Sequence, residues 1–144
     1  MLSNYTKIVL MTVVGLFANM LIAQNGHEVH KPNSDKYDQF IEEVYGDQAD
    51  ELVFSKPLRY KSIKKMLNER VEFIQYSKSP GQNHFTNITE VGMFDEYKSV
   101  SEDLIFDPTT FNILKYDIDF YKLHEEQRFL FKDTNFVIVI LPQL

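Results

Sequence analysis

The run at positions 136–141 constrains the fold of this chain more than any other segment. Its six residues, FVIVIL, are all apolar, and the β-branched types among them favour a strand. Side chains of a strand point alternately to its two faces, so a strand without polar residues must be buried on both. We therefore expect this run, with Val139 in the core, to lie centrally in a sheet or beneath helices.

The residues before this run complete a hairpin. RFLFKD at 128–133 is a second strand-like segment, and a tight turn near Asp133 and Thr134 separates it from the apolar run. Pro142 ends the second strand, because proline has no amide hydrogen to donate. The chain is thus predicted to finish in a two-stranded antiparallel unit.

The N-terminal half carries helical periodicity. Apolar residues recur at i, i+3, i+4, i+7 and i+8, namely Tyr37, Phe40, Ile41, Val44 and Tyr45. Gly46 then interrupts the pattern, which predicts either one helix weakened there or two short helices. Pro57 begins a further helix over 57–69, and VEFIQY at 71–76 predicts a strand.

The segment between the two halves is harder to assign. Residues 77–84 have the composition of a loop, and 85–106 fit neither the helical nor the strand period. ILKYDIDFY at 113–121 alternates apolar and polar residues, which predicts a half-buried strand with Lys115, Asp117 and Asp119 on its solvent face. The order of elements predicts an α+β fold, in which N-terminal helices pack on a small, mainly antiparallel sheet that ends in the C-terminal hairpin.

The first 24 residues indicate export. Lys7 precedes an uncharged apolar run at 8–23, and Ala23 stands before the polar Gln24. This is the layout of a signal peptide cleaved near Ala23/Gln24, and the run is shorter than the roughly 20 residues of a membrane-spanning helix. The predicted organisation is a signal peptide at 1–23, a flexible leader at 24–34 and one domain at 35–144. Retention of residues 8–23 as an N-terminal anchor is the alternative.

Composition excludes several classes of function. The chain has a net charge of −6 and no cysteine, so it lacks disulfides, thiolate catalysis and zinc–cysteine sites. An acidic chain is a poor candidate for nucleic acid, and we expect no stable membrane insertion after signal cleavage. Six cations between Lys56 and Arg70 form a local basic segment, which we interpret as offsetting the acidic residues at 42–51. A core rich in Phe and Tyr must stabilise the fold by itself.

Two pairs of residues are weak candidates for a metal or catalytic site. His27 and His30 form H-E-x-H in the predicted leader, which differs from the H-E-x-x-H of zinc proteases. Asp117 and Asp119 would lie about 7 Å apart on one strand face, where they could bind a cation or act as an acid/base pair. The predicted solvent exposure of both carboxylates favours a structural interpretation instead.

No motif in the sequence indicates catalysis or a cofactor. No G-x-S-x-G turn and no glycine-rich phosphate loop is present. We therefore expect an exported, periplasmic or extracellular, non-enzymatic binding module whose partner is a protein or an envelope component. The alternatives are a small hydrolase or metal-dependent enzyme, and an N-terminally anchored envelope subunit.

Overall fold

The computed structural model describes residues 27–77 and 85–143, and these form a helical layer on a five-stranded mixed sheet. The strand order is β1-β2-β5-β4-β3, and all neighbours are antiparallel except β3 and β4. The strands are β1 (Glu28–His30), β2 (Val71–Gln75), β3 (Thr86–Asn87), β4 (Gln127–Leu130) and β5 (Phe136–Ile140). The predicted α+β architecture with a C-terminal hairpin is confirmed. The predicted signal peptide lies outside the described residues.

Strand β5 occupies the centre of the sheet, as its uninterrupted apolar sequence predicts. It pairs along its whole length with β2, from Val71↔Ile140 to Gln75↔Phe136, and with β4 on its other side. Ile138 and Ile140 face the main core, whereas Val137 and Val139 join Leu130 in a smaller cluster. All four β5 side chains from Val137 to Ile140 are at most 1 % exposed.

The two predicted helices are present, and the first of them ends before Gly46. Helix α2 (Tyr37–Tyr45) buries all five residues of its apolar stripe, and α3 (Pro57–Arg70) buries Ile63, Met66 and Leu67. A 3-10 turn and a π-helical turn (Asp50–Phe54) connect them. Gly46 has a φ of +55°, a conformation that glycine adopts without steric cost. A Cβ there would also approach Lys98 to 3.2 Å.

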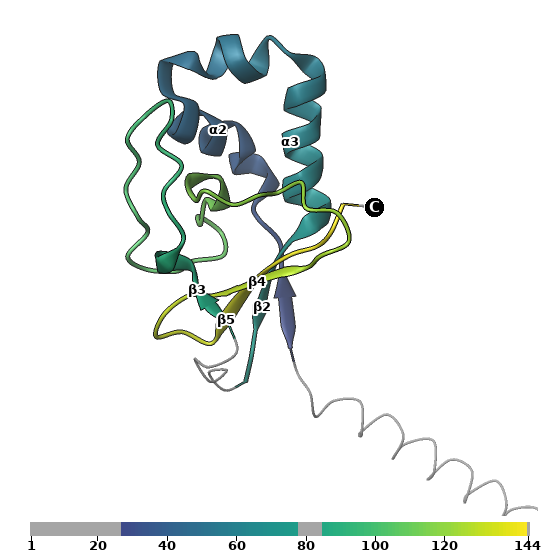
Figure 1. The fold of residues 1–144 in the computed structure, drawn as a ribbon, viewed down its shortest axis with the longest axis vertical. Coiled ribbons are helices and arrows are strands. Elements are labelled where there is room, and N and C mark those ends of the chain that lie inside the picture. The colour runs from purple at the N-terminus through teal and green to yellow at the C-terminus, as the bar shows by residue number, and fades with distance from the viewer. Residues whose placement is uncertain (1–26, 78–84, 144) are drawn as a thin grey trace, which may run out of the picture.

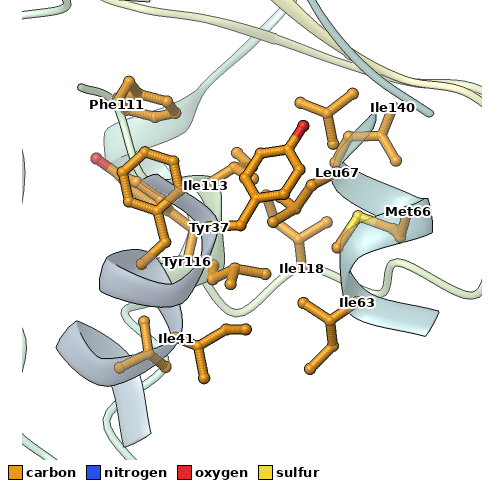
Figure 2. Close-up of a cluster of buried hydrophobic side chains, with 14 of the residues drawn as sticks. Tyr37, Ile41, Ile63, Met66, Leu67, Phe111, Ile113, Tyr116, Ile118 and Ile140 are labelled. Carbon is orange, nitrogen blue, oxygen red and sulfur yellow. The ribbon is translucent and has the colours of Figure 1, made fainter. Parts of the chain in front are cut away.

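The helices cover one face of the sheet. Figure 1 shows α2 and α3 on the same side of the sheet, with the long connection between β3 and β4 packed beside α2. Residues 88–126 make up this long connection. Figure 2 shows how its side chains Phe111, Ile113 and Tyr116 meet those of both helices and Ile140 of β5 in one core.

The strand predicted at 113–121 is wrong, because these residues belong to the irregular long connection. Ile113–Lys115 form a 3-10 turn, because the side chain of Asn112 accepts a hydrogen bond from the Leu114 amide at 3.1 Å and caps it. Among the described residues, the only β-bridge formed by residues 113–121 is the isolated bridge Met93↔Tyr116. The burial alternation of Tyr116, Asp117 and Ile118 is real, but it arises in irregular backbone packed against α2 and α3.

The predicted flexible leader at 24–34 also differs from the structure. Its residues Glu28–His30 form β1, which pairs with β2 at the sheet edge, and Lys31 Nζ binds Glu72 Oε1 at 2.8 Å. Pro32 is buried and its carbonyl accepts a hydrogen bond from the Tyr37 hydroxyl. The polar composition concealed a strand, since a short edge strand needs few apolar residues.

Candidate functional site

His27 and His30, the predicted histidine pair, pack on two different aromatic rings at the edge of the sheet. The ring of His27 packs on Tyr76, with centroids 4.2 Å apart, whereas that of His30 packs on Phe136 at 5.9 Å. Tyr76 belongs to the smaller cluster and Phe136 packs against the main core, so the two imidazoles are directed to opposite faces of the sheet. In residues 27–77 and 85–143 no three His, Asp or Glu side chains form a group that could hold a metal ion.

Asp117 and Asp119 line a cavity between α3 and the long connection. The cavity has a volume of about 220 Å³, and both aspartates are exposed at its wall. The backbone sets their positions: the Asp117 amide donates to the Gly92 carbonyl at 2.8 Å, and the Asp119 carboxylate accepts from the Tyr121 amide at 3.0 Å. The structure thus brings the aspartate pair to a cavity and leaves both histidines away from it.

Arg59 of α3 supplies the cation of this cavity, which we name the Arg59 cavity. Its Nη2 donates to the Tyr45 hydroxyl at 3.3 Å, and its guanidinium carbon lies 5.4 Å from the Tyr45 ring centroid. Tyr45 in turn stacks on Tyr97 at 5.2 Å, and Phe94 packs on the edge of Tyr97. A positive charge over aromatic faces gains cation–π attraction, which fixes the guanidinium at the wall.

The walls of the Arg59 cavity combine apolar surface with both kinds of hydrogen-bonding group. Ile63, Met66, Phe94 and Phe120 supply the apolar part, and Tyr121, 54 % exposed, stands at the rim. The guanidinium donates hydrogen bonds, while the carboxylates of Asp117 and Asp119 accept them. A group that enters this cavity can therefore bury an apolar body and pair both its donors and its acceptors.

A second, larger cavity adjoins the first. It has a volume of about 470 Å³ and shares Met66 and Tyr121 with the Arg59 cavity. Arg70 at the end of α3 lies in its wall, and we call it the Arg70 cavity. Arg70 Nε donates to the Leu141 carbonyl at 2.9 Å, and its buried Nη2 has no hydrogen-bond partner among the described residues.

The long connection contains a buried polar cluster that the sequence did not indicate. Lys115, predicted to face solvent, has a side chain only 3 % exposed. Its Nζ lies 2.6 Å from Asp103 Oδ1 and 3.5 Å from Glu43 Oε1 of α2. Burial raises the pKa of Asp103, and the Lys115 ammonium opposes that rise. Asn112, 1 % exposed, donates to the Phe40 carbonyl and to Glu43.

Lys115 and Asn112 lie inside the protein, whereas Asp103 and Glu43 keep some access to water, and Glu43 also lines a separate surface cavity beside α2. Burial also raises the pKa of the neighbouring Tyr116 phenol, with the charge of Asp103 adding to the effect. Lys115, which opposes the rise in the pKa of Asp103, also attaches the long connection to α2 through Glu43. We assign the cluster a structural role and place the candidate functional site in the two cavities.

Sequence reasoning missed both arginines as site residues, although one signal was available. Arg59 lies four residues before Ile63 and Arg70 four after Met66, so both flank the apolar stripe of α3. Positions at that spacing share a helix face with the stripe and lie at the boundary of the core. The tyrosines that surround Arg59 come from α2 and the long connection, and their convergence depends on the tertiary fold.

The chain matches no known protein family, no curated protein and no solved structure. Among the described residues, no helix is both long enough and apolar enough to span a bilayer. The function is therefore inferred from the residues that line the two cavities.

Proposed function

We propose that this protein is a non-enzymatic binding module of an exported compartment, and that the Arg59 cavity receives one side chain of a protein partner. The observation that carries the proposal is the composition of the wall: Arg59, Tyr45, Phe120 and Tyr121 around about 220 Å³. Arginine and tyrosine dominate the energetic centres of protein interfaces, because they bury large areas while keeping a polar end.

The size of the cavity supports a side chain rather than a whole small molecule. Pockets for drug-sized ligands usually span about 300–1,000 Å³, above the volume found here. A single aromatic or aliphatic side chain fits such a space, and the peptide backbone beside it would offer N–H donors to Asp119 and carbonyl acceptors to Arg59. Export rests on the N-terminal charge and apolar run, with the retained anchor at 8–23 as the alternative.

A small hydrolase remains the second candidate, because Asp117 and Asp119 share the cavity. General acid catalysis would require one carboxyl in an apolar environment that raises its pKa toward neutrality. Both aspartates are exposed to water. The binding proposal needs no such shift.

Side-chain analogues test the proposal directly. Amide signals of the ¹⁵N-labelled protein would be followed by NMR during titration with N-acetyltyrosine amide, N-acetylleucine amide and methyl glucoside. We expect the tyrosine and leucine analogues to shift signals of residues 117–121 and of Tyr45, and the sugar to shift none. Arg59→Gln should abolish the response to the tyrosine analogue.

A matched variant controls for charge. Lys61→Gln removes the same charge from an exposed position of α3 that does not line the cavity, and it should leave the titration unchanged. Shifts that appear elsewhere, or that persist in Arg59→Gln, would refute the cavity as the recognition site. Hydrolysis of an aryl glycoside that disappears in Asp117→Asn would instead establish the enzyme.

A further inference from the structure

Arg59 and Arg70 share an unusual electrostatic state. Both are half-buried on α3, and neither forms an ion pair with a carboxylate in the part of the chain that the structure describes. Carboxylates line both cavities, but none lies within ion-pair distance of Arg59 or Arg70. A half-buried cation without a paired carboxylate is costly, so each guanidinium would gain from an anionic partner. The buried Nη2 of Arg70, which lacks a hydrogen-bond partner, indicates the same unmet need.

The other charges of α3 do not meet this need. The acidic residues at 42–51 were expected to offset its basic segment, but the only ion pair of α3 among the described residues joins Lys65 to its own Glu69 at 3.8 Å. Within the described part of the chain, Lys64 reaches an acidic residue of α2 only through Tyr60, which accepts a hydrogen bond from Lys64 and donates one to Asp38. The acidic residues of α2 and α3 thus leave Arg59 and Arg70 without an ion-pair partner among the described residues.

The two arginines stand at the ends of one groove. The Arg59 and Arg70 cavities meet at Met66 and Tyr121, and α3 forms a wall of both. Eleven residues of helix separate the arginines, which corresponds to about 16 Å along the axis. An extended peptide covers that length with about five residues. The middle of the groove is apolar, and Leu141 and Pro142 extend this surface toward Arg70.

We propose that this groove binds an extended acidic segment of a partner protein. The apolar side chain that enters the Arg59 cavity packs on Met66 and Tyr121. One carboxylate of the segment binds Arg59, and a second about five residues away binds Arg70. The inference rests on the proposed binding function and adds the chemistry of the partner. Asp117, Asp119 and Glu69 line the same groove, so an acidic group is favoured there only where it pairs directly with one of the two arginines. An acidic polysaccharide fits less well, because it has no apolar side chain for the middle of the groove.

Selection from a library of random linear peptides displayed on phage tests this assignment, with the protein from Gln24 onward as the target. Enriched sequences should carry two acidic residues four to six positions apart, with an apolar residue between them. Synthetic labelled peptides would then be measured by fluorescence anisotropy. We expect Arg59→Gln and Arg70→Gln each to weaken binding about tenfold, and added salt to weaken it further.

A pair of added charges controls for stability. Ser62 lines the Arg70 cavity and Asn68 does not, although both are exposed positions of α3. Ser62→Glu should weaken peptide binding about tenfold by repulsion, whereas Asn68→Glu should change it by less than about twofold. This pair decides the question even where Arg70→Gln unfolds through loss of the bond to Leu141, which thermal melting would reveal.

The possible failures are distinct. Enriched peptides that lack the acidic pair, or that bind Ser62→Glu normally, would overturn the acidic segment and leave the Arg59 cavity as a binding site. An oligouronate that binds the groove more tightly than any peptide would overturn the peptide and identify a polysaccharide. Absence of any enriched peptide, together with no NMR response to the side-chain analogues, would refute both proposals.

Discussion

The central strand and the long connection are both buried, but different forces hold them. Strand β5 is anchored by backbone pairing on two sides and by apolar side chains on two faces. The long connection has little regular pairing, and its residues Asn112 and Lys115 attach it to α2 through buried polar contacts. Burial of a strand follows from local sequence, whereas a polar attachment requires partners that are remote in the chain.

The largest expected effect in this comparison is at β5. Val139→Asp places a carboxylate where the native side chain is 1 % exposed, and the cross-strand neighbour Arg128 is already paired with Glu126. The cost should be several kcal/mol, enough to unfold a domain whose whole stability is about 5–15 kcal/mol. Urea denaturation followed by circular dichroism would measure it.

Asp117→Asn serves as the control for that variant. Asp117 is exposed at the wall of the Arg59 cavity, so its neutralisation should change the free energy of unfolding by less than about 0.5 kcal/mol. A tolerated Val139→Asp would mean that the sheet face carrying Val137 and Val139 is open. A large effect of Asp117→Asn would show that its charge has a partner in the fold.

The next effect concerns the long connection. Lys115→Met keeps most of the side-chain volume but removes the ammonium that pairs with Asp103 and Glu43. Both carboxylates retain some access to water, so we expect a loss of about 1–3 kcal/mol rather than complete unfolding. Lys132→Met, at an exposed position between β4 and β5, should stay within about 0.5 kcal/mol.

Hydrogen exchange would locate the change. In Lys115→Met the amides of Phe94 and Asp117, which bond to the Lys115 and Gly92 carbonyls, should exchange faster, while those of β5 keep their protection. Equal stability of Lys115→Met and the native protein would show that apolar packing alone secures the connection. The comparison between the two regions would then lose its physical basis.

The elements that sequence reasoning identified are those whose partners repeat at a fixed period. The stripe of α2, the start of α3 at Pro57 and the apolar run of β5 all follow from spacing, and the α+β class follows from their order. Lys115 is an exception to this periodicity. The alternation of apolar and polar residues around it predicted an exposed side chain, but ion pairs with Asp103 and Glu43 allow it to be buried. A strand and an irregular segment that packs one side inward produce the same alternation.

The candidate site was predictable only in part, for the same reason. Asp117 and Asp119 could be picked out as an exposed pair, but the cavity that they line is completed by Arg59 and Tyr45 from other elements. Neither arginine belongs to a recognised motif. Their significance comes from lying half-buried without a carboxylate partner among the described residues, which is a property of the tertiary structure.

The smallest predicted effect is a pH dependence of stability that comes from Asp103, the partner of Lys115 in the long connection. Burial raises the pKa of Asp103 in the folded state above the value of about 3.9 that an aspartate has in an unfolded chain. A raised pKa means that the folded state binds the proton more tightly. The stabilisation from this group is therefore fully present below pH 3.9 and is lost as the pH rises through the folded-state pKa.

Asp103→Asn cannot titrate at this position, so the difference in unfolding free energy between native protein and variant isolates the group. As the pH falls from 7 toward 4, that difference should move in favour of the native protein, and the other carboxylates cancel because both proteins carry them. Urea denaturation at several pH values would show the slope. A slope of opposite sign would mean that attraction to Lys115 outweighs burial, so that the ion pair holds the Asp103 carboxylate in its charged form. The long connection would then be secured mainly by the Lys115 charge pair, and it would weaken in acid, whereas β5 has no titrating group and would not.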